Sequence, residues 1–130
     1  MKEQLKLKLL AAFTGIYIIL LTRLAFQIKN YEILYYSIIL YVGIILVLFL
    51  YKNKIKLHFY HYLLLSIFWL SNLLGSNIYL NGIKLYDTWL LFLRYDQLVH
   101  LFGGFVISLL IFKLFKKYLK KLFDQNKLLF

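Results

Sequence analysis

The residues best suited to chemistry are an aspartate and a histidine near the start of the last apolar segment. Asp96 and His100 are four positions apart in the stretch YDQLVH that begins at Tyr95. On a helix, side chains four apart share one face, so the carboxylate could orient the imidazole. Histidine changes its charge near neutral pH, which suits proton transfer. Asp96 and His100 are therefore the candidate catalytic residues, acting as an acid–base pair.

Three further polar residues could complete a ligand site with this pair. Asp87 and Arg94 precede it in a short segment, and Asn72 lies in the apolar stretch before that. Ionisable groups within membrane spans usually face a bundle interior or an aqueous cavity. The candidate ligand-binding set is thus Asp87, Arg94, Asp96, His100 and Asn72. A structural interpretation stays open. In it, Asp96 caps the start of a helix, Arg94 neutralises the Asp96 carboxylate, and His100 only has its hydrogen bonds satisfied.

Other chemistries find little support. Asp87, Asp96 and His100 could bind a metal ion, but no dense ligand motif is present, so we predict neither a metal nor a cofactor. The chain has no cysteine and therefore no thiolate site. The net charge of +11 would suit nucleic acid. However, the basic residues lie between apolar segments and after the last one, so we expect no nucleic-acid partner.

Four apolar segments are long enough, or nearly so, to hold these residues in a bilayer. Hydrophobic residues make up 63% of the 130 residues, against roughly 45–50% in soluble domains. A helix needs roughly 20 apolar residues to cross. The expected spans are 9–28, 33–51, 59–80 and 97–115. We therefore predict one all-α membrane domain over residues 1–130, a bundle of four transmembrane helices.

Two segments lie outside these spans. Residues 85–93 are apolar but too short to cross, so we expect an interfacial helix or a re-entrant piece on the outer side, with Trp89 at the headgroup level. Residues 116–130 form a basic tail, and apolar positions at helical spacing extend the helix to Phe123. This tail is either an amphipathic strip on the inner leaflet or an ordinary stop-transfer flank.

Lysine and arginine gather at one end of the expected spans. Only Arg23, Lys29, Lys84 and Arg94 fall at the other end. The positive-inside rule places the larger group, and with it both termini, in the cytoplasm. That group comprises Lys2, Lys6, Lys8, Lys52, Lys54, Lys56, Lys113, Lys116, Lys117, Lys120, Lys121 and Lys127.

The stretch around the Asp–His pair resembles the YjdF-type family of small bacterial and archaeal multi-pass membrane proteins. In that family a Tyr-Asp-x-x-x-His-x-x-x-Gly-Phe block opens a span. The matching residues here are Tyr95, Asp96, His100, Gly104 and Phe105, with Gly75, Tyr79, Asp87 and Trp89 upstream. VanZ-like proteins are similar in a looser way, through an Asp-x-x-x-His at the start of a span. The resemblance implies a prokaryotic cell-membrane protein and a site location, but no reaction.

This sequence departs from the family pattern at one informative position. The residue after the aspartate is usually basic in such families, and here it is Gln97. Any anion-binding role of that basic residue would have to pass to Arg94. Family members are also typically longer, with more spans.

Three hypotheses about function follow. The leading one is a membrane protein that binds a lipid-like or envelope-related ligand in an outward-facing polar groove. The second is a membrane-embedded enzyme that uses Asp96 and His100. The third is a structural subunit that packs against a partner or a second copy through small residues, namely Gly103, Gly104 and Ser108. Membrane lipids are expected partners in every case.

Overall fold

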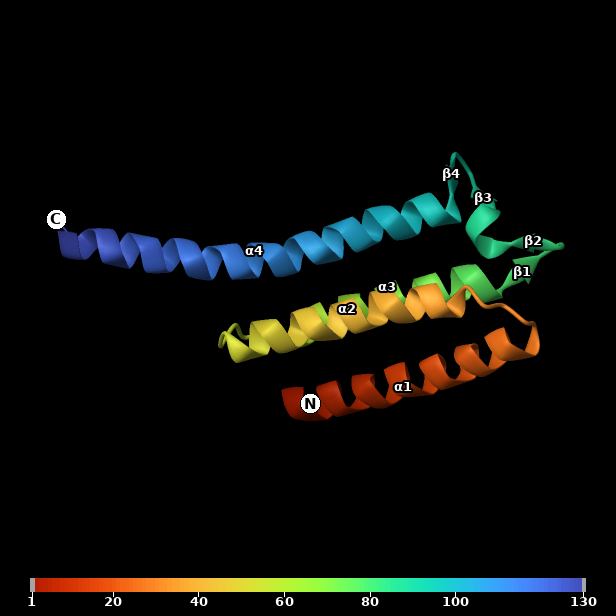
Figure 1. Cartoon of the computed structure of the whole chain (residues 1–130), viewed down its shortest axis with the longest axis horizontal. Helices are drawn as coiled ribbons and strands as arrows, with labels where there is room; N and C mark the ends of the chain where they lie inside the picture. The colour runs from red at the N-terminus through yellow and green to blue at the C-terminus, as the bar shows by residue number, and fades with distance from the viewer. Residues whose placement is uncertain (1, 130) are drawn as a thin grey trace.

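The computed structural model describes residues 2–129, with side chains described through residue 126. Four helices run side by side (Figure 1). They are α1 (Glu3–Gln27), α2 (Ile33–Lys52), α3 (Phe59–Asn77) and α4 (Tyr95–Leu129). A helix is therefore present in each of the four regions where a span was predicted.

Two of the helices end without glycine or proline. Lys29 and Lys54 adopt positive φ values of 55° and 56° just after α1 and α2. The amide of Asn30 then donates to the carbonyl of Ala25, and the amide of Ile55 donates to that of Leu50. These six-to-one bonds define Schellman motifs. The lysines accept the left-handed conformation because the motif satisfies carbonyls that would otherwise be unpaired.

Helix α3 is the centre of the bundle. Both α1 and α4 pack along it, and α2 contacts it more lightly. Its buried residues include several polar ones, namely His61, Ser66, Asn72, Ser76 and Asn77. The cores on its two sides are apolar and contain Leu65 with Val106 and Leu110, and Leu73 with Tyr17 and Ala25.

Apolar side chains cover the outside of the bundle. Within the described residues, three helices are long and apolar enough to cross a membrane: Glu3–Gln27, Ile33–Lys52 and Tyr95–Asn126. Only 11% of the most apolar window of α1, and 11% of that of α2, is buried inside the protein. So much exposed hydrocarbon requires lipid or a partner around it. Helix α3 is not in this set, because its apolar residues alternate with the buried polar ones.

The segment between α3 and α4 differs from the prediction. The expected span 59–80 ends as a helix at Asn77, and residues 85–93 do not form the expected interfacial helix; a re-entrant position of this segment stays a prediction. Instead, β1 (Tyr79–Leu80) pairs with β2 (Ile83–Lys84), and β3 (Trp89–Leu90) pairs with β4 (Leu93–Arg94). A 3-10 turn, η1 (Leu85–Asp87), joins the two hairpins.

The first hairpin has a clear local cause. Asn81 and Gly82 have φ values of 52° and 79°. Two positive φ values are what the tight turn of a two-residue hairpin requires, and Asn-Gly is its preferred sequence. The Asn-Gly pair therefore specifies both the turn and the pairing of β1 with β2.

Helix α4 extends well past the other helices (Figure 1). It begins at Tyr95, two residues before the predicted start, and its 35 residues run without interruption through most of the predicted tail. At 1.5 Å per residue it is about 52 Å long, more than the roughly 30 Å of a hydrocarbon core. One end of α4 must therefore project beyond any bilayer that the bundle crosses. Residue 130 of the predicted tail lies outside the described residues.

Candidate functional site

Four of the five predicted ligand-binding residues line one cavity of about 380 Å³. This polar cavity lies at the hairpin end of the bundle, between α2, α3, η1 and α4. Asn72, Asp87, Asp96 and His100 reach it from three separate segments. The remaining lining residues are Glu32, Tyr35, Tyr36, Ile39, Lys84 and Tyr86.

Tyr86 and Asn72 form the inner wall of the polar cavity. The Tyr86 hydroxyl donates to Asn72 Oδ1 at 2.6 Å, and the Asn72 amide donates to the carbonyl of Phe68 at 2.8 Å. Tyr86 is only 9% exposed, and burial raises the pKa of its phenol. The phenol therefore stays protonated and acts as a fixed hydrogen-bond donor.

Two aromatic rings and one glycine hold Tyr86 in place. Its ring centroid lies 5.8 Å from that of Tyr36 and 5.9 Å from that of Tyr95. A Cβ added to Gly75 would come within 2.7 Å of the Tyr86 ring and 2.8 Å of the Tyr95 ring. The Tyr95 hydroxyl also donates to the carbonyl of Ser71 at 2.9 Å. Gly75 therefore allows η1 and the start of α4 to close onto α3.

An ion pair ties α2 to the first hairpin at the rim of the cavity. Lys84 Nζ lies 2.7 Å from Glu32 Oε1. The hydrogen bond to Glu32 raises the pKa of the Lys84 ammonium. Lys84 is therefore paired with a carboxylate of the protein itself, so its charge is not left unpaired for a ligand.

Arg94 does not line the polar cavity. Its guanidinium lies 3.2 Å from Asp96 Oδ2 and pairs with that carboxylate. The carboxylates of Glu32, Asp87 and Asp96 line the cavity with a single cation, Lys84. Even with Arg94 counted, the balance is negative. The predicted compensation of Gln97 by Arg94 for anion binding is thus not supported by this geometry.

The predicted contact between the Asp96 carboxylate and the His100 ring is absent. His100 Nδ1 instead lies 2.6 Å from the backbone carbonyl of Asp96. A carbonyl only accepts, so Nδ1 carries the proton, and in the neutral ring Nε2 is the acceptor. The spacing of four residues does bring Asp96 and His100 into contact, but the contact is made by the backbone of Asp96 and not by its carboxylate. The carboxylate is held by Arg94 and by the amide of Gln97 at 2.8 Å.

The start of α4 is capped by Gln97, and not by Asp96 as the structural interpretation expected. Gln97 Oε1 accepts a hydrogen bond from the amide of Arg94 at 3.0 Å. Gln97 therefore makes the reach-back bond of a capping box, with Arg94 at the cap position. Asp96 lies in the first turn, where its charge suits the helix dipole.

Metal-ligating side chains do not cluster in the part of the chain that the structure describes: it holds no group of three His, Asp or Glu residues placed to share an ion. Asp87, Asp96 and His100 line the same cavity without forming such a group.

The three small residues of α4 divide between two faces. Gly103 is buried, and a Cβ there would come within 2.4 Å of the Phe68 ring, so it sets the close contact of α4 with α3. Gly104 has open space where its Cβ would lie, and both Gly104 and Ser108 are exposed. Packing of Gly104 and Ser108 against another chain stays a prediction.

Sequence reasoning missed Glu32, Lys84, Tyr36 and Tyr86. A usable signal was the scarcity of acidic residues. The chain has only five, and three of them, Glu32, Asp87 and Asp96, line the polar cavity. The tyrosines carried no such signal, because the chain contains 12 of them.

Comparison with known families decides the class of the protein. Residues 9–129 match the sequence model of a family described as "Predicted membrane protein (DUF2238)". The chain belongs to this family. The match covers every residue that lines the polar cavity, and it confirms the predicted resemblance to a membrane-protein family of YjdF type. No curated protein and no solved structure matches the chain. The looser similarity to VanZ-like proteins stays a prediction.

Proposed function

We propose that this member of the DUF2238 family crosses a prokaryotic cell membrane four times and presents the polar cavity on the outer side. The family match and three span-length apolar helices support a membrane location. Helix α3 would be the fourth span, with its polar residues shielded by its neighbours. The lysine-rich ends of the helices would face the cytoplasm.

We further propose that the polar cavity binds the polar part of a lipid-like or envelope-related ligand. The observation that carries this proposal is the convergence of Asn72, Asp87, Asp96 and His100, from three segments, on one cavity of about 380 Å³. Ligand pockets of proteins typically measure roughly 300–1,000 Å³. A purely structural role for these residues would not require them to share a cavity.

The charges of the cavity favour a neutral or cationic polar group over an anion. Carboxylates outnumber cations among the lining residues, and Lys84 is already paired with Glu32. Tyr35 and Tyr36 add ring faces, which suit sugars and organic cations. A hydroxyl-rich or amine-bearing headgroup therefore fits better than a bare phosphate.

Ligand identification in a native membrane tests this proposal. The protein is extracted with its surrounding lipid into nanodiscs, and bound molecules are identified by mass spectrometry. A species enriched with the wild type should fall about tenfold in Asp87→Asn, which removes a negative charge, and about tenfold in His100→Ala, which removes a hydrogen-bonding ring. Asp124→Asn, on the exposed part of α4, is the matched control. Equal recovery from all four proteins would refute a ligand at this site.

The enzyme hypothesis remains a second candidate for the same cavity. It is favoured by the hydrogen bond of His100 Nδ1, which leaves Nε2 as an acceptor that can take a proton. Ligand added at a concentration that saturates both proteins should then be converted over time by the wild type and not by His100→Ala. Conversion that is identical in the two proteins would exclude His100 as the base.

A further inference from the structure

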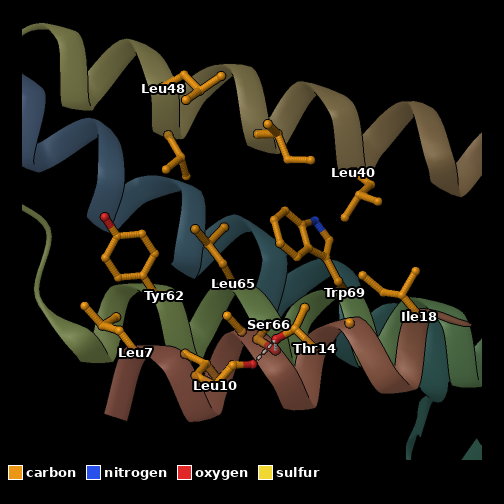
Figure 2. A pocket seen from close by; sticks show the side chains of 14 residues that line it. Leu7, Leu10, Thr14, Ile18, Leu40, Leu48, Tyr62, Leu65, Ser66 and Trp69 are labelled. Atoms are coloured by element: carbon orange, nitrogen blue, oxygen red, sulfur yellow. Dashed lines mark hydrogen bonds between the residues drawn. The ribbon is translucent and has the colours of Figure 1, made fainter. Parts of the chain in front are cut away.

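A second cavity, of about 580 Å³, lies between α1 and α2 with α3 as its floor (Figure 2). We call it the apolar groove. Nearly all of its lining side chains are hydrocarbon or aromatic. They are Leu7, Leu10, Ala11, Thr14, Gly15, Ile18, Leu40, Ile44, Val47, Leu48, Tyr62, Leu65, Ser66 and Trp69.

The hydroxyl groups of Thr14 and Ser66 in the apolar groove are turned toward each other. Thr14 Oγ1 donates to the carbonyl of Leu10 at 2.7 Å and lies 2.6 Å from Ser66 Oγ, as the dashed lines in Figure 2 show. The Tyr17 hydroxyl donates to the carbonyl of Ser66 at 2.7 Å. These bonds join α1 to α3. Because these hydroxyl groups bond within the protein, the surface that faces an occupant is mainly apolar.

Small residues on α1 and one large residue on α3 shape the apolar groove. Trp69 rises from α3 toward α2 (Figure 2), and a Cβ on Gly43 of α2 would come within 2.6 Å of its ring. On the opposite wall, a Cβ on Gly15 of α1 would meet nothing within 4 Å. Trp69 thus packs against α2, while the small residues Ala11 and Gly15 leave the space beside α1 unfilled.

The apolar groove is too small to enclose a helix. A helix with its side chains is about 10 Å across, so even two turns need roughly 850 Å³. The apolar groove offers about 580 Å³. A flexible hydrocarbon chain fits this volume, and the exposed apolar faces of α1 and α2 on either side would already lie among such chains.

We propose that the apolar groove holds one hydrocarbon chain of a membrane lipid between α1 and α2. Transfer out of water does not drive this binding, because a lipid chain leaves other lipid rather than water. The preference must therefore come from close packing against Trp69, Leu65 and the bare backbone at Gly15.

This site is separate from the polar cavity. Between the two lies a space of about 30 Å³, lined by Leu40 and Trp69 on one side and by Tyr36 and Asn72 on the other. That volume is far smaller than either cavity, so this space separates the two rather than joining them. The lipid-chain site therefore does not rest on the proposed function of the polar cavity.

Gly15→Leu tests the proposal, with Gly104→Leu as the matched control. Both glycines lie in helices, and a Cβ at either meets nothing within 4 Å, so both variants should fold. The probe is a phosphatidylcholine with a diazirine in its acyl chain, mixed into vesicles of phosphatidylethanolamine and phosphatidylglycerol. After illumination, adducts on α1 and α2 are mapped by mass spectrometry.

The wild type and Gly104→Leu should carry adducts concentrated on residues 7–18 and 40–48. Gly15→Leu should lose these at least about fivefold while keeping those on the outer faces. Uniform labelling that Gly15→Leu does not change would overturn the proposal. So would a wild-type dimer, detected by mass in the same vesicles, that Gly15→Leu converts to a monomer. If Gly15→Leu fails to fold, Ala11→Phe on the same wall replaces it.

Discussion

Tyr86 joins two parts of the protein that are 14 residues apart, through its hydrogen bond to Asn72. Its hydroxyl is buried, and its loss would leave Asn72 Oδ1 without that donor. We expect Tyr86→Phe to lower the free energy of unfolding by about 1–3 kcal/mol. Thermal unfolding in detergent micelles measures the change, and Tyr118→Phe on the exposed face of α4 is the control. An unchanged melting temperature would mean that the bond contributes nothing.

Gly75 and Gly104 offer a paired test at the residue scale. An added Cβ would collide with Tyr86 and Tyr95 at Gly75 but would meet nothing at Gly104. We expect Gly75→Ala to cost about 1–3 kcal/mol through overpacking. Gly104→Ala should be neutral or stabilising by up to about 1 kcal/mol, because alanine favours the helix. Equal effects of the two substitutions, in the same unfolding assay, would contradict the packing around Tyr86.

The sequence predicted which residues line the polar cavity better than it predicted which hydrogen bonds they make. The spacing of Asp96 and His100 placed both on the cavity, since helix geometry follows from spacing alone. It could not show that the imidazole prefers the backbone carbonyl, because that choice depends on how Arg94 and Gln97 hold the carboxylate. Glu32 was missed because its role depends on where the first hairpin brings Lys84.

The four helices lie where apolar segments of sufficient length predicted them. Their exact ends were not predicted, because the ends depend on local hydrogen bonds. Lysines in left-handed conformations end α1 and α2, where a reader of sequence expects glycine. Asn81 and Gly82 specify the first hairpin locally, whereas the packing of η1 against α3 is a tertiary contact that no local pattern reports.

The link between α2 and the first hairpin should weaken at alkaline pH. The hydrogen bond to Glu32 raises the pKa of Lys84 above its ordinary 10.5. This contribution to stability is fully present below pH 10.5 and is lost as the pH rises through the raised pKa. Burial of Tyr86 acts in the same direction, from its ordinary value of 10.0 upward. Stability should therefore fall above about pH 10.

Melting temperatures of the wild type and Lys84→Gln between pH 8 and about pH 11 measure this effect. The variant should be less stable near neutral pH, and its further loss at high pH should be smaller. The same alkaline loss in both proteins would show that the Lys84–Glu32 pair does not contribute.

The whole molecule is a bundle organised around α3, with a polar cavity at one end and a basic helix projecting from the other. The family match and the apolar exterior establish a membrane protein. The proposed orientation places the hairpins and the polar cavity outside the cell and the lysine-rich turn after α2 inside. A ligand from the envelope would reach the cavity only in that orientation.

Single-cysteine labelling in intact cells tests this orientation most directly. The chain has no native cysteine, so Asn81→Cys in the first hairpin and Asn53→Cys after α2 give unambiguous signals. A membrane-impermeant maleimide should label Asn81→Cys in intact cells, and should label Asn53→Cys only after the cells are opened. Labelling of Asn53→Cys in intact cells, with Asn81→Cys protected, would contradict the outward-facing cavity on which the proposed function depends.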